Sequence, residues 1–313
     1  MILTRARLRP LLLRAAAVLI TGTAATGCFT GVESTPKITD ADVRRETTPP
    51  TPDETYLHDV RYAPRAQWQE GRPFVVTDAK ISRALVPDAY GQRQLAEGDT
   101  LRYEGLTPGR SLASELVSDL RFIDTGGNGF TFRVDVEPDS LLQRVVKVPF
   151  AIDCDIVDQT SAKLLGKRFY IVTSARRDSA GTIWRARKFV PVTVDEVAVG
   201  TAVNPVRVRI VDEGNPPAYL FINPEARSGR SAGSFASMLS LTNPRDRYPL
   251  ITDAVWENIT NNRVSVGMTR QECKLALGAP AEVIQRPGYG YLYEAWRYDN
   301  GTYLMFEDGL LVK

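Results

Sequence analysis

The sequence predicts a multidomain protein in which a β-rich N-terminal region precedes a small C-terminal α+β domain. Three observations support this prediction. Residues 56–224 contain short runs of β-branched and aromatic residues, which glycine and aspartate clusters separate. Residues 250–313 instead carry helix-capping signals followed by hairpin signals. The chain has 313 residues, enough for two or three small domains behind a leader and a tether.

The first 27 residues have the features of a secretory signal. Four arginines and no acidic residue accompany an apolar stretch at 15–20, which is too short to span a membrane. Without these four arginines, the formal net charge falls from +2 to −2. The mature chain therefore has no basic stripe for a phosphate backbone, and we do not expect it to bind nucleic acid.

The leader ends in Ala25-Thr26-Gly27-Cys28, which resembles a bacterial lipobox. In a lipobox the signal peptidase cuts before the cysteine and the thiol carries the lipid, so Cys28 is the expected lipidation site. An ordinary cleaved signal and an uncleaved anchor are the alternatives. The residue after Cys28 is Phe29 rather than aspartate. By the sorting rules of such lipoproteins, this predicts an outer-membrane location facing the periplasm.

Two stretches are predicted to connect folded parts. Residues 28–55 are polar and include a proline- and threonine-rich run at 47–52, which predicts an extended tether. Residues 225–249 are rich in small and polar types, which predicts a connector to the last domain.

The β-rich region divides into modules at 56–150 and 151–224. Segments 71–77 and 166–173 look alike, since each runs from a glycine through a basic residue into β-formers. This similarity suggests a duplicated small barrel or sandwich, with chance similarity of two strands as the alternative. A short helical piece is expected at 112–120. The expected strands are 73–77, 100–103, 130–136, 145–152, 168–173, 182–194, 206–211 and 219–222.

The C-terminal domain, 250–313, has a strong helix start. Thr269 is followed three residues later by Glu272, which makes a capping box, and Met268 and Cys273 occupy the positions of a hydrophobic staple. We therefore expect a helix that begins at Thr269.

The end of this helix is also marked. Gly278 suits a left-handed C-cap, and Pro280 cannot continue a helix. An earlier helix is expected to begin at the cap Thr252 and to run to about Thr260. Asn-Gly and Asp-Gly pairs then separate β-formers, which predicts a three-stranded antiparallel meander. Its strands are expected at 292–298, 302–306 and 310–312.

Residues 252–313 resemble the SmpA/OmlA domain, the BamE-like lipoproteins of the Gram-negative outer membrane. Gly267-Met268-Thr269, Leu277-Gly278-Ala279-Pro280 and Trp296-Arg297-Tyr298 carry the match. The chain departs from the family in Cys273, where an aliphatic residue is usual, and in its long N-terminal region. The resemblance implies a helix-helix-sheet fold and a role in binding a protein partner, with outer-membrane or envelope assembly as the process.

Aromatic residues near the first predicted strand of this domain are candidates for that partner site. Tyr289 and Tyr291 lie in a glycine-rich loop, where we expect exposure, whereas Trp296 is expected to pack on the helices. Tyr289 and Tyr291 are therefore the predicted partner-binding residues.

One catalytic motif occurs in the sequence. The segment Gly229-Arg230-Ser231-Ala232-Gly233 matches the G-x-S-x-G nucleophile elbow, in which a base must reach the serine. The single histidine, His58, precedes this serine and lies near the tether. A flexible linker therefore explains the motif better. Ser34-Thr35-Pro36-Lys37 matches S-x-x-K but belongs to the tether.

Acidic and thiol side chains are the remaining candidates for a metal or redox site. Asp153, Asp155 and Asp158 resemble a calcium set, but a solvated strand face with Cys154 toward the core is the simpler interpretation. Cys154 and Cys273 are expected to be buried, inert thiols in separate domains, with a disulfide as the alternative. The sequence has no zinc spacing, phosphate loop or dinucleotide fingerprint. It therefore predicts no catalytic residue, metal or cofactor.

These observations favour a non-catalytic, lipid-anchored envelope protein that binds or scaffolds a protein partner. One alternative is a cell-wall or glycan-acting enzyme or binding protein that uses acids of the β-rich region. Another is an enzyme inhibitor, since the helix-helix-sheet unit also resembles the repeats of β-lactamase inhibitory proteins. The sequence does not predict an oligomeric state.

Overall fold

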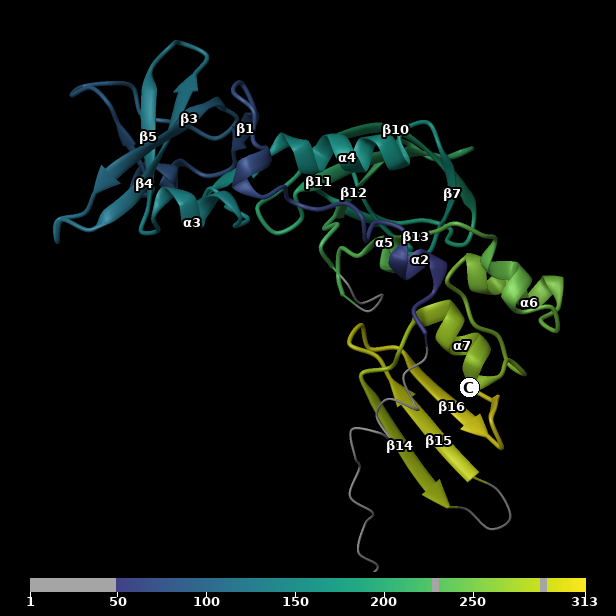
Figure 1. The fold of residues 1–313 in the computed structure, drawn as a ribbon. Helices are drawn as coiled ribbons and strands as arrows, with labels where there is room; N and C mark the ends of the chain where they lie inside the picture. Colours follow the sequence, from purple (N-terminus) through teal and green to yellow (C-terminus); the bar gives the residue numbers. More distant parts are fainter. Residues whose placement is uncertain (1–48, 227–230, 288–291) are drawn as a thin grey trace, which may run out of the picture. The chain divides into compact units, whose positions relative to one another are not determined.

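The computed structural model describes residues 49–226, 231–287 and 292–313. They form a β-rich fold of three antiparallel sheets with short helices, and the first two sheets are curled (Figure 1). The β-rich part of the predicted fold class is therefore confirmed. None of the helices in these residues has the length and apolar character that crossing a bilayer requires. The predicted signal, Cys28 and most of the predicted tether lie outside the described residues.

The first sheet has six strands in the spatial order β2-β5-β4-β3-β1-β6. Successive side chains of a strand face opposite sides, so Phe74 and Val76 of β1 both point into the core. Aromatic rings meet edge to face there, as Phe74 and Phe122 do at 5.4 Å between centroids. The elements are η1 (Arg65–Gln67), β1 (Pro73–Val76), η2 (Ala79–Arg83), β2 (Leu85–Pro87), β3 (Thr100–Arg110), β4 (Leu116–Asp124), β5 (Gly129–Val134), α3 (Pro138–Leu142) and β6 (Ala151–Asp153).

The second sheet has seven strands in the order β13-β7-β10-β11-β12-β8-β9. In β11 the inward residues Val206, Val208 and Ile210 are buried, and those between them are less so. The helix α4 packs against β10 and adds Ile156 and Leu164 to this core. The elements are α4 (Cys154–Leu164), β7 (Arg168–Ile171), β8 (Ala175–Arg177), β9 (Ile183–Arg185), β10 (Pro191–Val199), β11 (Val206–Val211) and β12 (Ala218–Ile222).

The two curled sheets share one topology. In each, three consecutive strands form a meander, β3-β4-β5 or β10-β11-β12. The first strand of the meander pairs with β1 or β7, the last pairs with β2 or β8, and β6 or β13 (Leu239–Ser240) pairs with the far side of β1 or β7. Strand β9 of the second sheet has no counterpart in the first. A bulge follows Tyr103 in the first meander and Val194 in the second. The carbonyls of these two residues accept hydrogen bonds from Gly71 at 2.7 Å and Gly166 at 2.8 Å. The two look-alike segments of the sequence therefore begin equivalent strands.

The core of the second sheet also draws on residues far from its strands in sequence. Leu57 and Val60 come from the beginning of the described chain, and Phe235 and Leu239 come from the predicted connector. The predicted connector contains α5 (Phe235–Met238), β13 (Leu239–Ser240) and η3 (Pro244–Arg247).

A buried carboxylate joins the two ends of this core. Asp53 lies in α2 (Pro52–Thr55), inside the predicted tether, and is 6 % exposed. Its carboxylate accepts hydrogen bonds from Ser240 Oγ and Arg247 Nη2, each at 2.8 Å, and from the backbone N–H of Leu241 at 2.9 Å. These bonds fasten α2 to the region just before the C-terminal helices.

The C-terminal part places two helices before a sheet of order β14-β15-β16-β17. Thr252 caps α6, and Thr269 forms the expected capping box at α7. The sheet has four strands rather than the three expected, because β14 pairs with β15 along its whole length. The elements are α6 (Asp253–Thr260), α7 (Arg270–Leu277), β14 (Glu282–Pro287), β15 (Leu292–Arg297), β16 (Tyr303–Glu307) and β17 (Leu310–Leu311).

Four local predictions are wrong. The strand expected at 145–152 is limited to the start of β6, and the strand expected at 182–194 is divided between β9 and β10. The piece expected to be helical at 112–120 leads instead into β4. The segment Asp153-Cys154-Asp155 is not a strand face, because β6 ends at Asp153 and its side chain caps α4 by accepting a hydrogen bond from the Asp155 N–H. Cys154 is therefore the first residue of a helix, and it is half-buried.

Candidate functional site

The residues of the C-terminal motif meet at the start of α7, where their roles are structural. The Glu272 carboxylate accepts a hydrogen bond from the Thr269 N–H at 2.7 Å, and the Thr269 hydroxyl oxygen accepts one from the Glu272 N–H at 3.3 Å. Met268 and Cys273 are both buried in the same core cluster. This arrangement agrees with a capping box and staple that fix where α7 begins.

Two glycines bound the same motif. Gly267 and Gly278 each have a φ of 89°, a conformation that favours glycine. Pro280 follows α7 and is half-buried. These residues shape the ends of the helix and expose no reactive group.

Three other predicted site residues lie outside the described residues. They are the lipidation site Cys28 and the candidate partner-binding residues Tyr289 and Tyr291. All three stay predictions.

One face of the C-terminal sheet packs into the core, and the other face points away from it. Trp296 and Leu304 pair across β15 and β16 and point into the core that contains α7. Because side chains alternate along a strand, their neighbours Ala295 and Met305 point to the opposite side. Ile284 of β14 lies beside Ala295 on that side.

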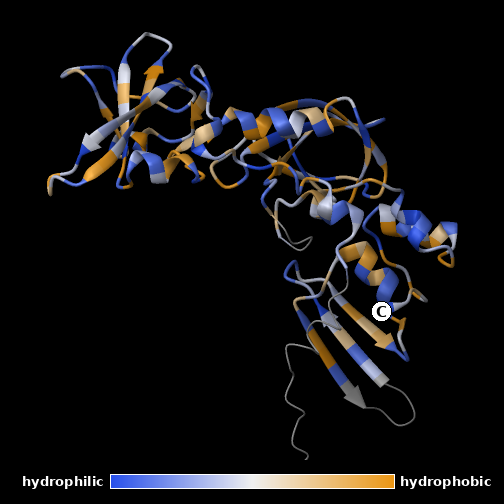
Figure 2. Ribbon diagram, viewed as in Figure 1, coloured by the Kyte–Doolittle hydropathy of each residue, from blue (hydrophilic) through white to orange (hydrophobic). Residues whose placement is uncertain are grey.

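We define the outer sheet face by Ile284, Tyr293, Ala295, Tyr303 and Met305, which surround a shallow hollow of about 280 Å³. Ile284 is 39 % exposed and Tyr303 is 50 % exposed. Figure 2 shows consecutive hydrophobic residues along β14 and β16, so both faces of the sheet carry apolar side chains. Contiguous exposed apolar residues mark interaction sites, whereas single ones do not.

Charged side chains border this face. Arg297 and Glu282 form an exposed ion pair at 2.8 Å between Nη2 and Oε2. Glu307 lies beside Tyr293 across the β15–β16 pair. An apolar centre with a charged border is the anatomy of a protein-binding surface.

A buried carboxylate holds the sheet that carries this face. Glu294 is 5 % exposed and accepts hydrogen bonds from Arg270 of α7 at 2.9 Å, from Gln285 of β14 at 2.8 Å and from the Trp296 indole. Burial alone would raise its pKa, but the bonds from Gln285, Trp296 and Arg270 outweigh burial and lower it. Glu294 therefore stays ionised at neutral pH and ties α7, β14 and β15 together.

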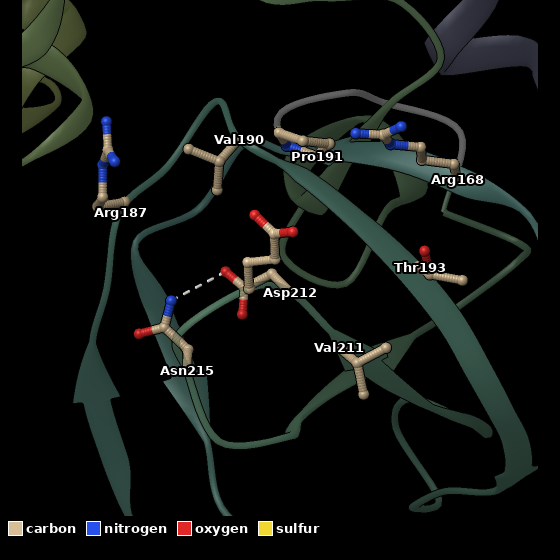
Figure 3. Close-up of a pocket in the computed structure, with 9 residues that line it drawn as sticks. Arg168, Arg187, Val190, Pro191, Thr193, Val211, Asp212 and Asn215 are labelled. Atoms are coloured by element: carbon tan, nitrogen blue, oxygen red, sulfur yellow. Dashed lines mark hydrogen bonds between the residues drawn. The ribbon is translucent and has the colours of Figure 1, made fainter.

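A second candidate site is a polar pocket of about 500 Å³ in the second sheet (Figure 3). Figure 3 shows Arg168 and Arg187 on opposite sides of the pocket and Asp212 between them. Its volume lies within the range of small-ligand sites, about 300–1,000 Å³. Its polar lining residues are Arg168, Arg187, Thr193, Asp212, Glu213 and Asn215.

A buried ion pair underlies this pocket. Arg176 is 1 % exposed and donates from Nη1 to Asp212 Oδ2 at 2.9 Å and from Nη2 to the Arg187 carbonyl at 2.9 Å. Asn215 also donates to Asp212 Oδ2, at 3.1 Å. The Asp212 side chain is only 5 % exposed, although it lines the pocket.

Two of the three acids that resemble a calcium set, Asp153 and Asp155, pair with an arginine, and Asp158 is exposed. Arg72 Nη2 lies 2.7 Å from Asp153 Oδ2 and 2.9 Å from Asp155 Oδ2. In the described part of the chain, no group of three or more histidine, cysteine, aspartate or glutamate side chains is arranged to hold a metal ion.

The remaining reactive side chains lie apart. Ser231 lies in a turn, where its carbonyl accepts a hydrogen bond from the Ser234 N–H. Cys154 and Cys273 are free thiols in α4 and α7, and burial raises their pKa values to about 11 and about 12. Both thiols therefore stay protonated at neutral pH, and a protonated thiol is a poor nucleophile.

Besides Arg176, two further buried cations were not foreseen from the sequence. Arg65 is 8 % exposed, and its guanidinium lies 4.4 Å from the centroid of the Tyr103 ring. Lys188 is also 8 % exposed and donates from Nζ to the Ala276 carbonyl of α7 at 2.7 Å. No sequence signal separates such residues from exposed basic ones, because their burial depends on distant segments.

Comparisons with protein-family models, with curated proteins and with solved structures give no match for this chain. The function is therefore argued from the chain's own residues.

Proposed function

We propose that this protein is a non-catalytic, lipid-anchored component of the outer membrane, facing the periplasm, that binds a protein partner through the outer sheet face. The lipobox-like segment ending at Cys28 supports the anchor. The resemblance of residues 252–313 to the SmpA/OmlA domain supports a helix-helix-sheet unit with an envelope-assembly role.

The observation that carries the proposal is the apolar character of the outer sheet face. Ile284, Tyr303 and Met305 gather on one side of the sheet, opposite to the side that packs on α7. Tyrosine and methionine are enriched at protein interfaces, and tyrosine is among the residues that supply most of the binding energy there. The Glu294 bonds join β14 and β15, and β16 pairs with β15 along the sheet, so little ordering entropy is lost on binding.

The partner we propose is a protein that presents aliphatic and aromatic side chains, with charges complementary to Glu282, Arg297 and Glu307 at its border. Such rim charges set orientation and association rate more than affinity. The lipid anchor would place this partner at the same membrane.

Site-specific photo-crosslinking in intact cells tests the proposal. A photoreactive phenylalanine analogue replaces Tyr303 in the full chain, and the matched control replaces Tyr90, an exposed tyrosine far from this sheet in sequence. We expect the Tyr303 position to crosslink one membrane-fraction protein and the Tyr90 position not to do so. Tyr303→Glu should then reduce co-purification of that protein by about tenfold, the loss of one interface anchor.

Two outcomes contradict the proposal. Equal crosslinking from both positions would show that contacts are random. Absence of any crosslink at Tyr303, in cells where the protein is membrane-bound, would show that the outer sheet face is not an interface.

A further inference from the structure

We propose that the polar pocket of the second sheet binds a small zwitterion, a free amino acid or short peptide whose carboxylate meets Arg168 and whose ammonium group meets Asp212 and Glu213. This site is separate from the outer sheet face and goes beyond the function proposed above.

The first argument is the unused acceptor in the pocket. Asp212 Oδ2 accepts from both Arg176 and Asn215, whereas no described residue donates to Asp212 Oδ1. The side chain is 5 % exposed and lines the pocket, so a ligand in the pocket can donate a hydrogen bond to its free oxygen. An ammonium group or a hydroxyl is the kind of ligand group that supplies one.

The second argument is the balance of charge around the pocket. Arg176 is neutralised by Asp212, and Arg187 pairs with Glu257 of α6 at 2.9 Å. The other two charged residues that line the pocket are Arg168 and Glu213, and neither forms an ion pair with another described residue. One unpaired cation and one unpaired anion in a single pocket complement a ligand that carries both charges.

The third argument excludes simpler ligand classes. A polyol would satisfy Asp212 but would leave Arg168 and Glu213 without charged partners. An anion would meet Arg168 but would be repelled by Glu213, which has no ion-pair partner among the described residues. Val190, Pro191 and Val211 add apolar walls that suit a short side chain.

The experiment is isothermal titration of the purified full chain with the dipeptide Ala-Ala. Three related probes dissect the recognition: N-acetyl-Ala-Ala lacks the ammonium group, Ala-Ala amide lacks the carboxylate, and glucose is a polyol. The pocket variants are Arg168→Gln and Glu213→Gln. Their matched controls are Arg102→Gln, at an exposed residue of β3, and Glu97→Gln, at an exposed residue of the turn before β3.

We expect the dipeptide to bind and both blocked dipeptides to bind about tenfold more weakly or not at all, since each loses one charge-assisted hydrogen bond. Each pocket variant should lower affinity by a similar factor, and the control variants should leave it unchanged. Far-ultraviolet circular dichroism verifies that all four variants are folded.

Three results would overturn the proposal. One is no binding of the dipeptide up to about 10 mM. Another is equal binding of the free and blocked dipeptides, which would remove the role of charge. The last is binding of glucose in preference to the dipeptide, which would assign the pocket to a polyol.

Discussion

Replacing Gly278 tests whether the end of α7 depends on a backbone conformation that only glycine adopts easily. Gly278 has a φ of 89° and a ψ of −171°, a region that other residues enter at a cost of about 1–3 kcal/mol. A Cβ built at this position would meet no atom within 4 Å. Gly278→Ala therefore adds backbone strain and no steric clash, so the whole effect reports on φ and ψ.

A second glycine provides the matched control. A Cβ at Gly105 of β3 would also meet no atom within 4 Å, but Gly105 does not have a positive φ. Gly105→Ala should be neutral or stabilising by about 0.4–1 kcal/mol, because alanine restricts the unfolded chain.

Amide hydrogen exchange measured by mass spectrometry gives the local readout. The α7 peptide includes the Cys273 N–H bonded to the Thr269 carbonyl and the Gly278 N–H bonded to the Lys274 carbonyl, both at 2.9 Å. A loss of about 1–3 kcal/mol predicts exchange about 5- to 160-fold faster in Gly278→Ala. Unchanged protection, or the same change in Gly105→Ala, would refute the strained-cap reasoning.

Two further predictions concern Lys188 and Cys28. Burial lowers the pKa of Lys188 from 10.5 to about 8, so between these pH values the unfolded chain holds a proton that the folded chain has released, and stability rises with pH. Lys188→Met should reduce this rise in stability by at most about 3 kcal/mol, because the hydrogen bond to the Ala276 carbonyl favours the ammonium form of the lysine. Urea unfolding at a series of pH values measures the free energy of unfolding. A rise that is the same in Lys188→Met would mean that another group causes it. Cys28→Ala should release the protein from membranes or leave an uncut precursor. Membrane fractionation followed by gel electrophoresis measures both effects. A variant that keeps the same gel mobility and stays in the membrane fraction would contradict lipidation.

Local signals predicted several elements well. The strand at 206–211 was expected with the bounds that β11 has, and the capping box at Thr269 starts α7. The similarity of 71–77 and 166–173 marked β1 and β7, which occupy equivalent places in two sheets of one topology. These successes share a cause: each signal lies within a few residues of the structure it specifies.

The failures have identifiable physical causes. α4 was missed because its apolar residues, Ile156, Val157 and Leu164, include β-branched types, and the acids before them resembled a strand face. β14 was missed because Gln285 and Arg286 break the apolar alternation expected of a strand.

The polar pocket has no sequence signature at all. Arg168, Asp212 and Asn215 are separated by more than forty positions along the chain at their widest, and antiparallel pairing of β7, β10 and β11 brings their region together. The buried pair of Arg176 with Asp212 likewise depends on non-local packing. Sites of this kind follow from topology, which single-sequence patterns specify only weakly.

The bonds from Ser240 and Arg247 to Asp53 join parts of the chain that are synthesised far apart in time. All strands of the first sheet lie between residues 73 and 153, so that sheet can form soon after its residues emerge. Leu57 and Val60 are synthesised earlier, but the core that they join also contains Phe235 and Leu239, nearly two hundred positions later. Closing so long a loop is slow. The core of the second sheet is therefore completed after that of the first.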